Sequence, residues 1–331
     1  MADLTQFLPD DRERGQLILI AAFILAVSFV VLAIVVNSAI FTENLATRDD
    51  VAGSQDALEH RYEVTQSIGE LLRVANNDTS INHTHVEESV ENVSAQGGVQ
   101  QSSLGRIVNL SYSGNETGLR IFQEDQTRNF RSNGTETQPP QNDWNLTTED
   151  EFAVRNFEIN VTDSTTLVDS DPFRIVANHT GDPAVEWSLT ISRHDSGDGI
   201  EVEVEHTTQG PESCTRDDVG DHTVVDVTGG TVEGEPCTAL TELQNGTDMW
   251  FGTGVNDPFR IEYENGDNIQ GTYSFIVNDT SVDSGLNVDN HPDDSEPHDA
   301  IYSVDVSYTY YTPSVGYETE IRVALGEVPD D

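Results

Sequence analysis

The densest group of side chains that could bind a ligand lies near the C terminus, in a run of acids and histidines. Their oxygen atoms could surround a divalent cation such as Ca²⁺, which takes about six to eight oxygen ligands. The run is broken by Pro292 and Pro297, and its spacing matches no known calcium loop. We therefore interpret it as a solvated acidic loop and expect no metal site. Its members are Asp289, Asn290, His291, Asp293, Asp294, Glu296, His298 and Asp299.

The sequence lacks the common catalytic motifs. It contains no GxSxG elbow, no HExxH and no glycine-rich phosphate loop, and Ser-x-x-Lys cannot occur because the chain has no lysine. Trp144, Trp187 and Trp250 could form a platform for a sugar ring, although Trp187 lies in a strand pattern and is more often a core residue. We expect no catalytic residue, no cofactor and no enzyme activity. An anchored extracellular hydrolase is the weakest alternative.

The charge of the chain is strongly one-sided. Its 331 residues include 60 acids against 15 basic residues, all of them arginine, and the formal net charge is −45. Disorder is one reading of such acidity, but frequent aromatic and β-branched residues in alternating patterns favour a folded protein. In concentrated salt, with a screening length of about 3 Å at 1 M, like charges hardly interact. We interpret the acidity as adaptation to salt, with recognition of a basic partner as the alternative. The lack of basic clusters argues against nucleic-acid binding.

The longest apolar stretch is Leu17 to Val36, which holds twenty residues without a charge. A helix of about 20 apolar residues spans a hydrocarbon core of about 30 Å. The stretch therefore predicts a transmembrane helix within residues 16–40, behind a cytoplasmic tail or leader at residues 1–15. Arg12 and Arg14 precede it and Arg48 follows, which weakly favours a cytoplasmic N terminus.

Eleven Asn-x-Ser/Thr acceptors lie on the C-terminal side of the apolar stretch. Such tripeptides also occur by chance in a chain rich in Asn and Thr, but this number favours an exported, glycosylated surface. The candidates are Asn77, Asn82, Asn92, Asn109, Asn115, Asn133, Asn145, Asn160, Asn178, Asn245 and Asn278.

Two cysteines, Cys214 and Cys237, lie on the same side of the apolar stretch. In an exported domain such a pair favours a disulfide, whereas a zinc or redox site is disfavoured because no CxxC and no nearby ligand pattern occurs. Closing a loop of about this size stabilises a fold by roughly 3 kcal/mol in the chain-entropy picture.

The junction Arg14-Gly15-Gln16-Leu17 resembles the class III signal of archaeal type IV pilins and pilin-like proteins. More narrowly, residues 12–48 resemble the N termini of a group of uncharacterised haloarchaeal single-pass membrane proteins. The resemblance implies cleavage after Gly15 and retention of the apolar segment in the mature protein. The chain departs from bacterial-type pilins because Ile20 occupies the fifth mature position, where those proteins have glutamate. The alternative is a simple helix start behind a charged flank.

Periodicity divides the rest of the chain. Apolar residues at helical spacing between Ala57 and Ala75 predict a stalk helix, and Thr84 to Glu87 has capping-box spacing for a second helix, which Gly97-Gly98 should end. From about Leu119 the period is two, as in Ile200, Val202 and Val204. A shift of phase predicts a bulge near Arg155-Asn156.

We expect an α+β chain, with an N-terminal transmembrane helix that continues into a helical stalk over residues 41–118. A large antiparallel, sandwich-like β domain over residues 119–331 should follow. The repeated pentapeptides that begin at Asp171 and Asp257 suggest two related units within it, at about 150–235 and 236–325.

The expected function is that of a single-pass cell-surface protein with a cytoplasmic N terminus and an extracellular C-terminal domain. The resemblance implies a pilin-like structural or assembly role, with membrane partners bound through the apolar segment. The alternative is a membrane-anchored extracellular binding or adhesion module that forms no filament.

Overall fold

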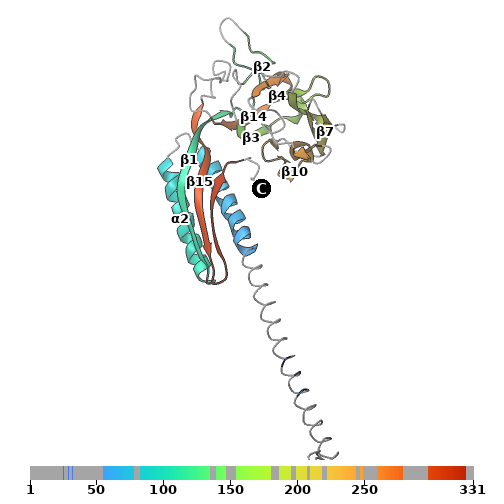
Figure 1. The fold of residues 1–331 in the computed structure, drawn as a ribbon. Helices are drawn as coiled ribbons and strands as arrows, with labels where there is room; N and C mark the ends of the chain where they lie inside the picture. The colour runs from blue at the N-terminus through green and yellow to red at the C-terminus, as the bar shows by residue number, and fades with distance from the viewer. Residues whose placement is uncertain are drawn as a thin grey trace, which may run out of the picture. The chain divides into compact units, whose positions relative to one another are not determined.

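The computed structural model consists mainly of two antiparallel β-sheets and two long helices (Figure 1). It describes Leu25, Phe29, Leu32 and residues 55–77, 83–134, 139–146, 154–179, 186–194, 199–206, 209–217, 222–243, 247–248, 259–278 and 297–325. Residues 55–76 are helical, and α2 spans His83–Ser102.

The larger sheet has eight strands, and the strand order mixes segments from distant parts of the chain. The order is β10 (Glu235–Pro236), β9 (Thr231–Val232), β8 (Thr223–Asp226), β3 (Val154–Val161), β14 (Gly271–Val277), β1 (Ile107–Gln123), β15 (His298–Tyr311) and β16 (Gly316–Val323). The predicted bulge lies in β3: Asn156 has a φ of 50°, and the register with β14 shifts between Ser274 and Ile276.

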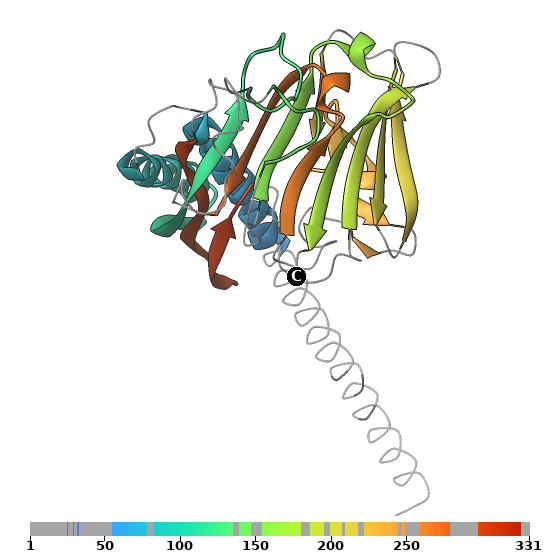
Figure 2. The same cartoon turned by 90° about the horizontal axis from the view of Figure 1, so that it is seen from above.

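The second sheet has six strands, four of which run side by side from green to yellow in Figure 2. Its order is β2 (Trp144–Asn145), β13 (Phe259–Glu264), β4 (Phe173–His179), β5 (Glu186–His194), β6 (Gly199–His206) and β7 (Gln209–Arg216). Two short strands, β11 (Glu242–Leu243) and β12 (Thr247–Asp248), pair separately, next to the short helix α3 (Thr238–Thr241).

The inward-facing side chains of both sheets form one hydrophobic core. Period-two alternation produces it, because every second residue of a strand points to the same face. Thus Phe157, Ile159 and Val161 of β3 are buried, and so are Val202 and Val204 of β6. Trp144 and Trp187 are also buried in this core, so neither of them forms an exposed sugar platform, and Trp250 lies outside the described residues.

The predicted fold class is wrong. The described part of the chain is mainly antiparallel β-structure, and its helices are not a stalk. Residues 107–118, which we expected in the stalk, belong to β1, because Val108 and Leu110 are buried while Ile107 and Asn109 are exposed, the alternation of a strand. Among the described residues, no helix is both long and apolar enough to cross a membrane. Of the expected membrane segment, only Leu25, Phe29 and Leu32 are described.

The chain divides into two compact units, Met1–Arg61 with Tyr310–Tyr317, and Tyr62–Thr309 with Glu318–Asp331. In the first unit, Ala57 is buried and the rings of His60 and Tyr310 lie 6.2 Å apart. The side chains of Leu25, Phe29 and Leu32 are exposed and share one helical face, since they are four and three residues apart. The buried contacts and the grooves described below belong to the second unit.

The end of the helix over residues 62–76 is fixed to β15 by one side chain. Asn76 is buried; its Nδ2 donates to the carbonyl of Ile301 at 2.9 Å, and its Oδ1 accepts from the amide of Ile301 at 2.8 Å. One amide side chain therefore satisfies both backbone groups of a buried strand residue.

We predict that Asn76→Ala lowers the free energy of unfolding by about 1–3 kcal/mol, because it leaves a buried N–H and C=O unpaired. Denaturant unfolding of the unglycosylated protein in molar salt measures the change. The neighbouring exposed Asn77→Ala is the matched control and should shift the midpoint little. Equal effects of the two substitutions would contradict a stabilising role for the hydrogen bonds between Asn76 and Ile301.

Candidate functional site

The sequence-predicted glycosylation sites differ in accessibility. The side chains of Asn77, Asn92 and Asn109 are exposed. Five others are half-buried, namely Asn115, Asn133, Asn145, Asn160 and Asn278. Asn178 lies in β4 without a described side chain, and Asn82 and Asn245 lie outside the described residues, as do Arg14, Gly15 and Gln16. The exposed three are the best placed to carry a glycan.

The two cysteines form the disulfide that the sequence predicts, with their Cα atoms 5.7 Å apart. Cys214 lies in β7, an edge strand of the six-stranded sheet, and Cys237 directly follows β10, an edge strand of the eight-stranded sheet. Cys237 is fully buried in the common core. The bond thus ties together the corresponding edges of the two sheets.

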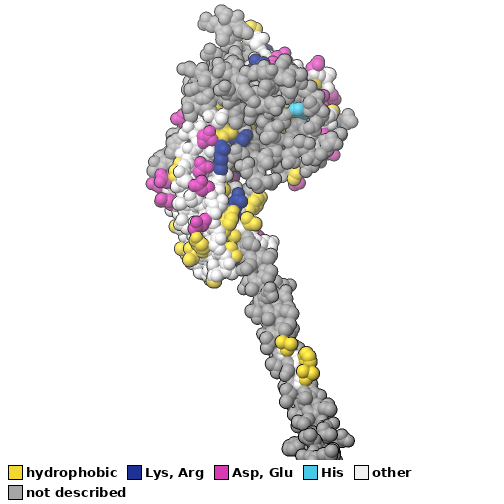
Figure 3. Space-filling model, viewed as in Figure 1, with side chains coloured by type: hydrophobic (Ala, Val, Ile, Leu, Met, Phe, Trp, Pro, Cys, Tyr) yellow, Lys and Arg dark blue, Asp and Glu magenta, His cyan; other side chains and the backbone are white. Residues whose placement is uncertain are grey.

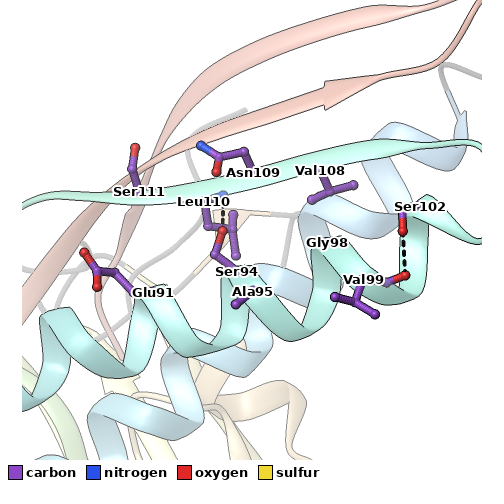
Figure 4. Close-up of a pocket in the computed structure, with 10 residues that line it drawn as sticks. All are labelled: Glu91, Ser94, Ala95, Gly98, Val99, Ser102, Val108, Asn109, Leu110 and Ser111. Atoms are coloured by element: carbon purple, nitrogen blue, oxygen red, sulfur yellow. Dashed lines mark hydrogen bonds between the residues drawn. The ribbon is translucent and has the colours of Figure 1, made fainter.

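An open groove of about 580 Å³ lies between α2 and β1 (Figure 4). The amide of Leu110 in β1 donates to Ser94 Oγ in α2 at 2.8 Å. A Cβ atom on Gly98 would lie 3.4 Å from the carbonyl oxygen of Val108, at van der Waals contact. The small residues of α2 therefore allow the helix to lie close to the backbone of β1, ahead of Leu119, where the pairing of β1 with β14 begins.

This contact explains why α2 does not end at Gly97-Gly98 as expected. The helix continues to Ser102, because packing against β1 compensates for the low helix propensity of glycine. The sequence signal for the contact was present in the spacing of Ser94, Gly98 and Ser102, four residues apart on one helix face.

An exposed apolar surface adjoins the groove, where the chain leaves α2 and enters β1. Val99, Leu104 and Ile107 are exposed by 74%, 64% and 66%. Figure 3 shows apolar side chains gathered over the lower end of α2 and acidic ones above them. The acids Glu87, Glu88 and Glu91 of α2 are exposed. Exposed apolar clusters of this kind are typical of interaction surfaces.

The outer face of the eight-stranded sheet carries a pair of carboxylates that the sequence analysis did not identify. Glu158 of β3 and Asp226 of β8 occupy directly opposite positions in an antiparallel pair. Burial raises the pKa of Asp226, while Gly229 and Thr228 donate hydrogen bonds that partly offset this shift. Burial, and next the charge of Asp226, raise the pKa of Glu158.

Two arginines lie near this carboxylate pair. Arg73 forms an ion pair with Glu70 at 2.8 Å, and its charge also acts favourably on Glu158 and Asp226. Arg120 is buried, and its Nε donates to Ser274 Oγ at 3.4 Å. Burial lowers the pKa of Arg120. The arginines offset only part of the free-energy cost of burying two neighbouring negative charges. The pair therefore retains a proton to a higher pH than exposed acids do.

The sign of the pH dependence follows from the raised pKa values. Because the folded state binds these protons more tightly, the stabilisation from the pair is complete at acidic pH and is lost as the pH rises through the raised pKa values. Once both carboxylates are ionised, the pair destabilises the fold, since like charges directly opposite in a sheet repel each other.

We therefore predict that Glu158→Gln raises the unfolding free energy at pH 7 by roughly 0.5–1 kcal/mol, and that the gain disappears toward pH 4. Chemical denaturation across this pH range in molar salt measures it. Glu205→Gln, which removes an exposed acid from β6, controls for the overall change in charge. A destabilised Glu158→Gln protein at pH 7 would show that the arginines outweigh the repulsion.

Residues 11–131 match the model of a family described as a family of unknown function (DUF7261). The match covers less than half of the chain and contains the apolar stretch, the helix over residues 55–76, α2 and β1. Neither a curated protein nor a solved structure matches the chain. In the part of the chain that the structure describes, no group of three or more His, Cys, Asp or Glu side chains could hold a metal ion, and residues 289–296 lie outside that part.

Proposed function

We propose that this chain is a non-catalytic, surface-exposed, pilin-like structural or assembly protein of a halophile. In this proposal the apolar segment Leu17–Val36 holds the chain at the cell membrane, residues before it lie in the cytoplasm, and the β-rich part lies outside the cell and carries glycans. The apolar segment also contacts other membrane partners.

The observation that carries the proposal is the order of features at the N terminus. A charged tail ends at Arg14-Gly15, Gln16 follows, and an uncharged apolar segment begins at once. The described side chains of that segment support a contact with lipid or with other subunits, because Leu25, Phe29 and Leu32 expose one apolar face. The family match begins within the tail and includes the whole junction.

Three features of the second unit support export and assembly. The Cys214–Cys237 disulfide fits an oxidising compartment. The exposed Asn77, Asn92 and Asn109 fit glycosylation outside the cell. The apolar surface at Val99, Leu104 and Ile107 favours contact with a second copy, since molar salt screens the acidic charges while apolar burial persists.

The alternative is a membrane-anchored binding or adhesion module without filament assembly. The open α2–β1 groove favours it, because a cavity of about 580 Å³ has the size typical of small-ligand sites. In that case the leader stays attached.

We predict that protein extracted from the membranes of a haloarchaeal host begins at Gln16, as intact and N-terminal peptide masses would show. Gly15→Val should retain residues 1–15, because it removes the glycine after which the peptidase cuts. Asp11→Asn changes the tail away from the junction and should still be processed. A wild-type protein that begins at Met1 or Ala2 would contradict pilin-like processing and favour the anchored module.

A further inference from the structure

A second groove, of about 560 Å³, lies at one end of the eight-stranded sheet. It is formed where β1 and β3 end and where β8 and β14 begin. Hydroxyl and amide side chains make up most of its wall, from Gln126, Thr127, Thr162, Ser164, Thr165 and Gln270. Its volume lies within the range of about 300–1,000 Å³ usual for small-molecule sites.

Two similar turns hold the wall of this polar groove in place. Asp125 Oδ1 accepts hydrogen bonds from the amide and the hydroxyl of Thr127, at 2.9 and 2.8 Å. Asp163 Oδ1 accepts the same pair from Thr165, at 2.9 and 2.5 Å. Arg193 Nη2 donates to the carbonyls of Ser164 and Thr165 at 3.3 and 2.6 Å. A wall fixed in this way loses little entropy when a ligand binds.

The wall offers both acceptors and donors to a ligand. The hydroxyls of Thr127, Thr162 and Thr165 each donate within the protein, so their lone pairs are available to accept. The side chains of Gln126, Ser164 and Gln270 make no hydrogen bond to any residue that the structure describes, so their donors are available as well. Alternating donors and acceptors are what a ring with several hydroxyl groups requires.

The charge of the groove excludes other ligand classes. Asp163 is the one carboxylate of the groove among the described residues, and its Oδ1 already accepts two hydrogen bonds from Thr165. A divalent cation, which needs several oxygen ligands, therefore has too few here. No arginine lines the described wall, and His222 is its one imidazole, so a phosphate has no bidentate partner. No large apolar side chain lines it, so a lipid chain has no apolar surface to contact.

We propose that this groove binds a neutral sugar unit, held by hydrogen bonds from Ser164, Gln126 and Gln270 and by the threonine hydroxyls. The proposal goes beyond the function proposed above and does not depend on cleavage after Gly15, so the two can fail separately. The sugar could belong to a free glycan or to a glycan on a neighbouring surface protein, and the chemistry of recognition is the same.

The test uses the full-length chain, purified in detergent and molar salt from a host that adds no glycans. Saturation-transfer-difference NMR with the methyl glycosides of glucose, galactose, mannose and N-acetylglucosamine detects binding. At least one glycoside should give a saturation-transfer signal, and that signal should fall when a free neutral glycan is added as a competitor. Adding the glycosylated protein from a haloarchaeal host as competitor tests the second source, because its glycans should displace the glycoside only if they are recognised.

Two substitutions locate the site. Gln270→Leu should weaken binding roughly tenfold, as expected for the loss of a hydrogen-bonding partner worth about 1.4 kcal/mol. Ser164→Trp should abolish binding by filling the groove, and neither Ser164 nor Gln270 uses its side chain in a bond that the fold needs. Ser102→Ala, in the α2–β1 groove, is the matched control and should bind as the wild type does. Absence of signal for all four glycosides, or signal that survives in both groove variants, would overturn the proposal.

Discussion

The structure depends on the burial of Tyr263 between the two sheets. Its ring lies 5.2 to 5.8 Å from the rings of Phe130, Trp144, Phe173 and Tyr273. These rings come from both sheets and from the segment between β1 and β2, so one aromatic cluster holds three parts of the chain in place. Burial raises the pKa of the Tyr263 and Tyr273 hydroxyls, which keeps both neutral while the acidic surface titrates.

The strand β1 connects this core to the helix-covered part of the second unit. Its residues Leu119 to Gln123 pair with β14 over the aromatic core, while Val108 and Leu110 face the region of α2. Gly118 lies at the transition, and a Cβ atom there would lie only 2.2 Å from the carbonyl of Val277. A side chain at this position is therefore incompatible with the pairing. The family match ends at residue 131, so it covers the helix over residues 55–76, α2 and β1 but not the later strands that build most of the core.

Much of the local structure could be predicted from the sequence. The alternation of Ile200, Val202 and Val204 correctly identified β6, and the shift of phase correctly located the bulge at Asn156. Strands and bulges of this kind can be predicted because they depend on the spacing of residues that are close in the sequence. Such spacing could not show that β3 pairs with β8, more than sixty residues away, and so the carboxylate pair of Glu158 and Asp226 went unrecognised.

The expectations of a stalk and of two related units both depend on which distant segments pack together, which the sequence alone does not show. Helical spacing predicts a stalk because it shows an apolar stripe but not the strands that pack against that stripe. The repeated pentapeptides open β4 and β13, which pair with each other, and Arg174 bonds Glu264 across them at 3.2 Å. The strands that follow, β5 and β14, belong to different sheets. The two related units remain a prediction, and so do the processing site and the polar groove's ligand.

We propose that the β-rich part folds outside the cytoplasm, where the disulfide between Cys214 and Cys237 ties its two sheets together. Blocking free thiols in intact haloarchaeal cells before lysis, followed by peptide mass spectrometry without reduction, tests it most directly. The account predicts a linked peptide pair containing both cysteines and almost no alkylated form of either. Recovery of both cysteines as alkylated free thiols would contradict it, because it would place the domain in a reducing compartment.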